Sequence, residues 1–362
     1  MRRKSRSRWT ENKHPRTLEA SQSSWYQTKL NLYRQIRAEV NRRVGSGPGD
    51  LQRYEKNQRR LRKIPLVATS DRTLSKAIES CDILLSGDFH TYAPSQKLHM
   101  NLLNILDGQK CLALECISKS KQKVLEDWVD GKLTEQEFLK QVDWDEFWGF
   151  PWIHYRPLFL LAQKKKIPLL AVGAGLRRRI KPGLDQRDRE MAKILLDYLR
   201  EHQNHKIFVV VGELHLLNSR GIERQLRERS HRKLKVVRVH QDIAEIYFRL
   251  AKRGRETQTD IVSFGQSEFC LLHSPPWLRW QSYLDFLEHH DQGTEAVDPH
   301  EKIWSLSRQM AREIESHLPS GDFNVVTADE IRGTKKNREP LRAFERKMLR
   351  VFLNRGQSLH LG

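Results

Sequence analysis

The sequence has 362 residues, enough to bury a sizeable core in one large or two medium domains. No stretch approaches the roughly 18 continuous apolar residues of a membrane span, and four scattered cysteines exclude a disulfide framework or a zinc ribbon. The net charge of +20 resides in the two ends, because residues 1–63 hold 18 Lys and Arg against 5 Asp and Glu, and residues 332–355 hold 9 against 2. These basic ends predict either a weak contact with a polyanion or a solvated surface that only favours solubility.

The N-terminal region is predicted to be a basic extension, residues 1–63. Residues 1–18 are polar and basic, which is typical of a disordered segment. They lack the apolar core of a signal peptide and a cysteine for lipid attachment, so a cytoplasmic location is predicted. Apolar residues at steps of three and four from Tyr26 to Val44 then predict an amphipathic helix, with its stripe packed on the body and its other face basic.

From residue 64 to residue 252, short apolar runs alternate with longer amphipathic ones. This pattern predicts an α/β domain with a mostly parallel sheet covered by helices. The predicted strands are 82–86, 110–114, 168–172, 206–211 and 234–239. The predicted helices lie near 95–106, 118–130, 134–141, 157–166, 186–202, 220–229 and 241–252.

A motif of glycine, acid, spacer and histidine follows two of the predicted strands. It reads GDFH at 87–90 and GELH at 212–215. Because ligands bind at the carboxyl ends of strands in open parallel sheets, the two acid–histidine pairs are predicted to converge on one site. Glu115 ends another strand and joins the predicted site, since a carboxylate there is awkward in a core. Alternatively, these acids only cap the helices that follow.

The segment 116–167 is a long insertion between two predicted strands, and it is rich in aromatic side chains. They are Trp128, Phe138, Trp144, Phe147, Trp148, Phe150, Trp152 and Tyr155. Such a cluster forms either the lid and lining of a cofactor pocket or the core of a small helical subdomain. Residues 253–362 are assigned no role; a helix is predicted at 278–290, and a basic terminal helix carries the apolar stripe 341–352.

These motifs, in this order, resemble the ChaN-like family of iron-regulated, haem-binding proteins, which shares a superfamily with TraB proteins, Tiki proteins and erythromycin esterases. The resemblance covers roughly residues 64–240. Its motifs are GDFH at 87–90, LALE at 112–115, the segment 131–172, DREMAKIL at 188–195 and VVVGELHL at 209–216.

The resemblance implies an α/β fold with a cleft formed by the two strand ends that carry the repeated motif. Carried over by position, the polar centre is Asp88, His90, Glu115, Glu213 and His215, with Tyr155 nearby. The family usually has glutamate where this chain has Asp88, which weakens the case for glutamate-dependent hydrolysis. ChaN-like members are associated with haem, whereas Tiki proteins and the esterases use these acids and histidines for hydrolysis.

Three functions follow as hypotheses. The first is a protein that binds haem or an iron-containing ligand, with an axial ligand from Tyr92, His154 or Tyr155. The second is a hydrolase with His90, Glu115, Glu213 and His215 as catalytic residues. It uses either a histidine as general base or a divalent metal held by Asp88, His90, Glu115, Glu213 and His215. The third is a polyanion-binding module that uses the basic ends.

Overall fold

The apolar runs of the sequence form the strands of a sheet in the computed structural model of the protein, which describes residues 16–45, 49–174, 183–218, 220–265 and 267–292. The chain divides into two compact units, Met1–Trp280 and Gln281–Gly362, and the whole sheet belongs to the first. Most of the segment predicted to be disordered, 1–18, and all of the predicted terminal helix, 341–352, lie outside the described residues.

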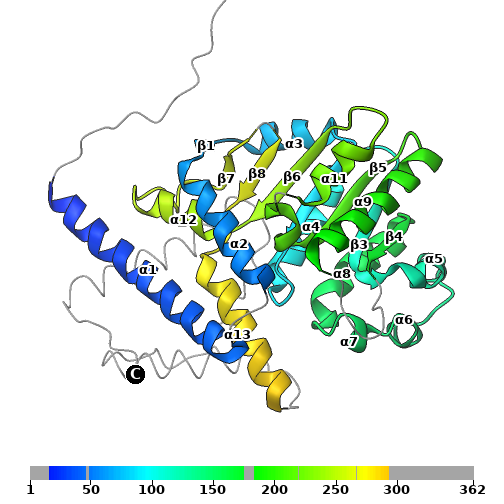
Figure 1. The fold of residues 1–362 in the computed structure, drawn as a ribbon, viewed down its shortest axis with the longest axis horizontal. Helices are drawn as coiled ribbons and strands as arrows, with labels where there is room; N and C mark the ends of the chain where they lie inside the picture. The colour runs from blue at the N-terminus through cyan, green and yellow to red at the C-terminus, as the bar shows by residue number, and fades with distance from the viewer. Residues whose placement is uncertain (1–15, 46–48, 175–182, 219, 266, 293–362) are drawn as a thin grey trace, which may run out of the picture. The chain divides into compact units, whose positions relative to one another are not determined.

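The described residues form an eight-stranded sheet in the order β1-β7-β8-β6-β2-β5-β3-β4 (Figure 1). All neighbouring strands run parallel except in the pairs β1–β7 and β7–β8. The predicted α/β class with a mostly parallel sheet is therefore confirmed. The strands are β1 Val67–Ala68, β2 Ile83–Asp88, β3 Lys110–Ser118, β4 Leu169–Gly173, β5 Lys206–Gly212, β6 Val236–Gln241, β7 Ile261–Ser263 and β8 Glu268–Leu271.

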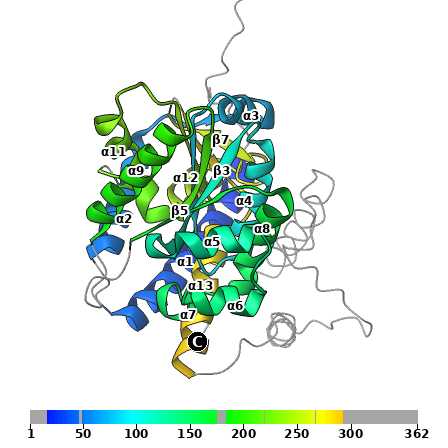
Figure 2. The ribbon, with the colours of Figure 1, turned by 90° about the vertical axis from the view of Figure 1, so that its right-hand side faces the viewer.

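Helices cover both faces of the sheet because alternate strand residues point to opposite sides. Leu84, Leu112 and Phe208 face α3, α4 and α8, whereas Leu85, Ala113 and Val209 face α9 and α11 (Figure 2). The longer helices of the first unit are α1 Arg16–Val44, α2 Gly49–Arg60, α3 Asp71–Glu79, α4 Ala93–Ile105, α5 Gln122–Val129, α8 Trp152–Lys165, α9 Leu184–Glu201, α11 Ile222–Arg229 and α12 Ala244–Ala251. Shorter ones are α6 Glu135–Gln141, α7 Trp144–Phe147 and α10 Glu213–Leu217, and α13 Pro276–Gln292 crosses the boundary between the units.

The predicted amphipathic helix is α1, which packs its stripe on the first unit. Its residues Tyr26, Leu30 and Tyr33 join the apolar cluster around α12, and the Tyr33 ring lies 5.3 Å from that of Phe248. Of the described helices, none is both long and apolar enough to span a membrane.

The sheet continues beyond residue 252, where the sequence predicts no strand. β8 pairs parallel with β6, and β7 connects β8 to the edge strand β1. These strands have only three and four residues, and runs this short give no detectable period of two. Pairing with neighbouring strands fixes them as strands: β8 pairs with β6, and β7 pairs with β8 and β1.

Candidate functional site

The carboxyl ends of β2, β5 and β3 lie side by side at one edge of the sheet. Asp88 is in register with Gly212, and Glu115 follows Leu114, which is in register with Val210. The structure brings the side chains of Asp88, His90, Glu115 and His215 to this end of the sheet, where they form two neighbouring groups.

The first group is centred on the buried carboxylate of Asp88. Its Oδ2 atom lies 2.9 Å from His90 Nδ1 and accepts a hydrogen bond of 2.7 Å from the Tyr155 hydroxyl. Its Oδ1 atom accepts a bond of 2.6 Å from Gln96, and His99 Nε2 is 3.8 Å away. Burial alone would raise the pKa of Asp88, but the hydrogen bonds and charges of His90 and His99 hold this pKa well below its usual range.

The His90 ring is the most accessible part of this group. A quarter of its side chain is exposed, whereas 2% of the Asp88 side chain is. The centroid of the His90 ring lies 4.5 Å from that of the Trp148 ring and 4.8 Å from that of the Phe150 ring. The aromatic insertion therefore forms an apolar wall beside His90. A Cβ atom at Gly212 would lie 3.2 Å from His90 Nε2 and 3.5 Å from Glu115 Oε2. The glycine of the second motif thus allows the end of β5 to lie close to the histidine of the first motif and to Glu115.

Most of the other aromatic residues of the insertion form a packed core. Trp128, Phe138, Trp144, Trp152 and Phe159 make mutual ring contacts with centroids 4.7 to 6.5 Å apart. One subset of rings thus packs within the insertion, and the rings of Trp148 and Phe150 contact His90.

The second group joins Glu115 and His215 to two residues of α9. Glu115 Oε1 lies 2.9 Å from His215 Nε2 and 3.0 Å from Arg187 Nη1, and Glu115 Oε2 accepts a bond of 2.7 Å from the Gly212 amide. His215 Nδ1 is bonded to Asp188 Oδ1, and Asp188 Oδ2 accepts a bond of 2.7 Å from Asn218. Both ring nitrogens of His215 are therefore bonded to carboxylates.

This environment holds His215 in its charged form. Burial alone would lower its pKa, but the charge of Glu115 and the hydrogen bonds to Asp188 and Glu115 outweigh burial and raise the pKa to about 9. The pKa of Glu115 lies well below its usual range: burial opposes this shift, but the charges of His215 and Arg187 dominate. A buried imidazolium has no free lone pair at neutral pH, so His215 is poorly suited to act as a general base.

Glu213, the acid of the second motif, is turned away from these two groups. It is the first residue of α10, and its Oε1 atom bonds His240 Nδ1 of β6 at 2.5 Å. Its Oε2 atom has no hydrogen-bond partner among the described residues and lies against Gly87, where a Cβ would be only 2.0 Å away. The predicted five-residue metal set is therefore not assembled. No three His, Cys, Asp or Glu residues within the described part of the chain are arranged to hold a metal ion.

The three predicted axial ligands lie in different surroundings. Tyr155 is buried, and its pKa is raised well above the usual value by burial and by the charge of Asp88. Tyr92 is also buried and stacks on His273 at a centroid distance of 6.5 Å. His154 is half-buried on α8, next to Tyr155 in the chain.

Sequence reasoning did not assign a role to several polar residues that complete the two groups or bind Glu213. They are Gln96 and His99 of α4, Arg187 and Asp188 of α9, Asn218 after α10, and His240 of β6. The sequence carries a signal for some of them, because Asp188 falls on the apolar stripe of α9 between Leu184 and Met191. A charged residue on the buried stripe of a helix requires a partner.

The melting temperature is expected to fall as the pH rises from about 6.5 to about 10. The folded-state pKa of His215 lies above the ordinary histidine value of 6.5, so its stabilising contribution is complete below about pH 6.5 and is lost as the pH rises through about 9. His240, whose pKa is also raised to about 9, adds a change of the same sign. Thermal unfolding followed by circular dichroism checks this, and a constant melting temperature across the range would contradict it.

Comparison with known proteins finds one family whose sequence model matches part of the chain. Residues 74–181 match the family described as haem-binding uptake, Tiki superfamily, ChaN. The match includes Asp88, His90, Glu115 and Tyr155 but ends before Asp188. No curated protein matches the chain.

Two solved structures have low similarity to the chain. One is described as cofacial haem binding to ChaN of Campylobacter jejuni, with 17% identity, a TM-score of 0.37, and coverage of 48% of this chain and 86% of that one. The other is the C-terminal region of Pasteurella multocida toxin, described as having a thiol-protease-like catalytic triad. It has 13% identity, a TM-score of 0.36, and coverage of 62% of this chain and 30% of that one. The family match over residues 74–181 agrees with the resemblance of the ordered motifs.

Proposed function

We propose that this chain binds haem at the carboxyl edge of its sheet, with Nε2 of His90 as the axial ligand. The observation that carries the proposal is the way His90 is held. Its Nδ1 atom lies 2.9 Å from Asp88 Oδ2, and in the neutral ring a proton on Nδ1 that is donated to this carboxylate leaves the lone pair of Nε2 for a metal. A histidine that ligates a metal commonly has its other nitrogen fixed by a carboxylate in this way.

The surroundings of His90 suit a flat apolar cofactor. The rings of Trp148 and Phe150 flank the imidazole, and a quarter of the His90 side chain is exposed, so a ligand can reach it from solvent. A side chain at Gly212 would crowd Nε2, and glycine avoids this. When bound, haem would supply an iron centre whose properties depend on the axial ligand and its hydrogen bonds.

His90 suits this role better than the residues proposed from sequence. The Tyr155 hydroxyl donates to Asp88, and its raised pKa disfavours the tyrosinate that iron ligation requires. The Tyr92 ring is buried against His273. In our proposal Tyr155 instead positions the Asp88 carboxylate that orients His90.

Hydrolysis receives less support from the same geometry. His215 has both nitrogens bonded to carboxylates, and Glu213 lies with His240 rather than with the other acids. The polyanion hypothesis rests on the charge of the two ends, and most of that charge lies outside the described residues.

A spectroscopic titration of the full chain with haem tests the proposal. We expect a defined shift of the Soret band in the native protein, and a loss of affinity of at least about tenfold in His90→Ala, because the axial bond is removed. Added imidazole should restore the Soret position of the variant, which a merely structural role of His90 would not allow.

The matched controls are His154→Ala, which removes a neighbouring imidazole, and Tyr155→Phe, which keeps the ring and removes the hydroxyl. Both should retain the native Soret position. The absence of any Soret shift in the native protein would refute haem binding, and loss of the band in Tyr155→Phe with retention in His90→Ala would assign the ligand to the tyrosine.

A further inference from the structure

A hollow of about 730 Å³ lies between α9 and α11, on the face of the sheet opposite α3, α4 and α8. Residues Gln203 and Asn204 precede β5, and Leu234 precedes β6, so the hollow is at the amino ends of these strands. The candidate haem site is at their carboxyl ends. Because α9 runs from one end to the other, Asp188 near its start bonds His215, whereas Lys193 and Arg200 line the hollow.

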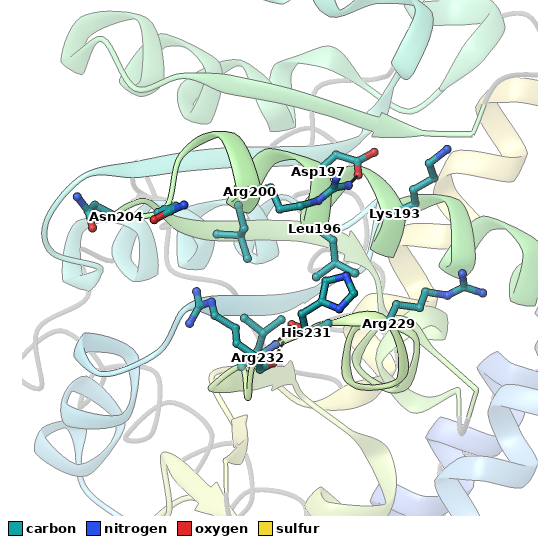
Figure 3. A pocket seen from close by; sticks show the side chains of 12 residues that line it. Lys193, Leu196, Asp197, Arg200, Asn204, Arg229, His231 and Arg232 are labelled. Atoms are coloured by element: carbon teal, nitrogen blue, oxygen red, sulfur yellow. Dashed lines mark hydrogen bonds and ion pairs between the residues drawn. The ribbon is translucent and has the colours of Figure 1, made fainter.

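The wall of the hollow is basic. Lys193 and Arg200 come from α9, and Arg229, His231 and Arg232 come from the end of α11 and the loop after it. Figure 3 shows these two groups on opposite sides of the hollow. Asp197 is the one acid in the lining, and it is bonded to Arg200. Five residues that carry or can carry positive charge thus surround a single carboxylate.

Two of these cations have no acidic partner among the described residues. Arg232 pairs with Asp82 at 2.9 Å, and Arg200 pairs with Asp197. Arg229, in contrast, bonds only the neutral side chain of Gln225, at 3.3 Å, and no ion pair involves Lys193. Cations in the last turn of a helix offset its dipole, but Lys193 lies two turns before the end of α9, and His231 and Arg232 lie beyond α11. The dipoles therefore do not account for the whole group.

The floor of the hollow is apolar. Leu196, Leu199 and Leu234 line it, and Figure 3 shows Leu196 and His231 directed toward each other. The volume is within the range of roughly 300–1,000 Å³ that is usual for small-molecule sites. A ligand that matches both the basic wall and the apolar floor of the hollow has more than one negative charge and an apolar body.

We propose that this hollow is a second binding site, which takes a small phosphorylated compound with an apolar body, of the nucleoside diphosphate class. Arginine guanidinium groups recognise phosphate oxygens in a bidentate manner, and lysine adds a mobile point charge. The three leucines and the His231 ring provide the surface for the apolar body. This site is independent of the haem site, because the two share no residue.

Isothermal titration of the full chain with ADP tests the proposal, with pyrophosphate and adenosine as parallel ligands. We expect ADP to bind most tightly, pyrophosphate more weakly because it lacks the apolar body, and adenosine not measurably. The double variant Lys193→Glu/Arg229→Glu should bind ADP at least about tenfold more weakly. Both side chains are exposed, so the fold should be retained.

The matched control is Arg72→Glu/Lys76→Glu, which changes one lysine and one arginine at exposed positions of α3 on the other face of the sheet. It has the same net charge as the first variant and should change ADP affinity by less than about twofold. The proposal is overturned if neither ADP nor pyrophosphate binds at about 1 mM, if adenosine binds as tightly as ADP, or if the control loses as much affinity as the pocket variant.

Discussion

Replacing Asp188 with alanine is expected to lower the free energy of unfolding by roughly 3–5 kcal/mol, because it removes one partner of a buried ion pair. The Asp188 carboxylate is fully buried and bonds both His215 Nδ1 and the Asn218 amide. Without it, the imidazolium of His215 keeps only Glu115, and the Asn218 amide loses a strong acceptor. Urea unfolding of the purified variant measures the loss.

Two further variants separate the effect of the Asp188 charge from the effect of its buried position. Asp188→Asn keeps an acceptor for His215 and should lose less stability than Asp188→Ala. Asp197→Ala removes an acid from the same helix, where it forms an exposed pair with Arg200, and should cost less than about 1 kcal/mol. Equal losses in Asp188→Ala and Asp197→Ala would show that the buried network does not stabilise the fold.

The Asp188→Ala variant also checks the origin of the charge on His215. Losing the Asp188 hydrogen bond should lower the pKa of His215 from about 9. The melting temperature of the variant should therefore depend less on pH on the alkaline side than that of the native protein.

Replacing Gly173 with alanine is expected to destabilise the protein by about 3 kcal/mol, at the upper end of the usual cost of overpacking. A Cβ atom there would lie 2.5 Å from the carbonyl oxygens of both Glu115 and Ile117. These are backbone atoms of β3 at the point where its register with β4 shifts, and they cannot move without disturbing the strand pair.

The control for this prediction is Gly183→Ala. Gly183 precedes α9 with φ of −61°, and a Cβ there would meet nothing within 4 Å. Alanine should therefore change the stability by only a few tenths of a kcal/mol, since it is a slightly poorer residue than glycine before a helix. Urea unfolding of both variants gives the comparison, and equal effects would mean that close approach to β3 is not what requires Gly173.

The predicted strands and long helices depend on local patterns, and for this reason the sequence alone located them well. The run 82–86 became β2 at Ile83–Asp88, and 206–211 became β5 at Lys206–Gly212. Apolar runs of this length indicate buried strands wherever they occur. Short elements such as α10 and β7 hold too few residues for a period to be visible, and contacts with the rest of the fold determine them.

What the sequence determined by itself is that acids and histidines stand at the carboxyl ends of parallel strands, because the order of strand, glycine, acid and histidine is local. Only the tertiary structure decided which of them meet. Glu213 begins α10 and turns to His240, whereas His215 meets Asp188, 27 positions away in the chain. The protonation of His215 was decided in the same way, since a pKa depends on burial and on charges contributed by other elements.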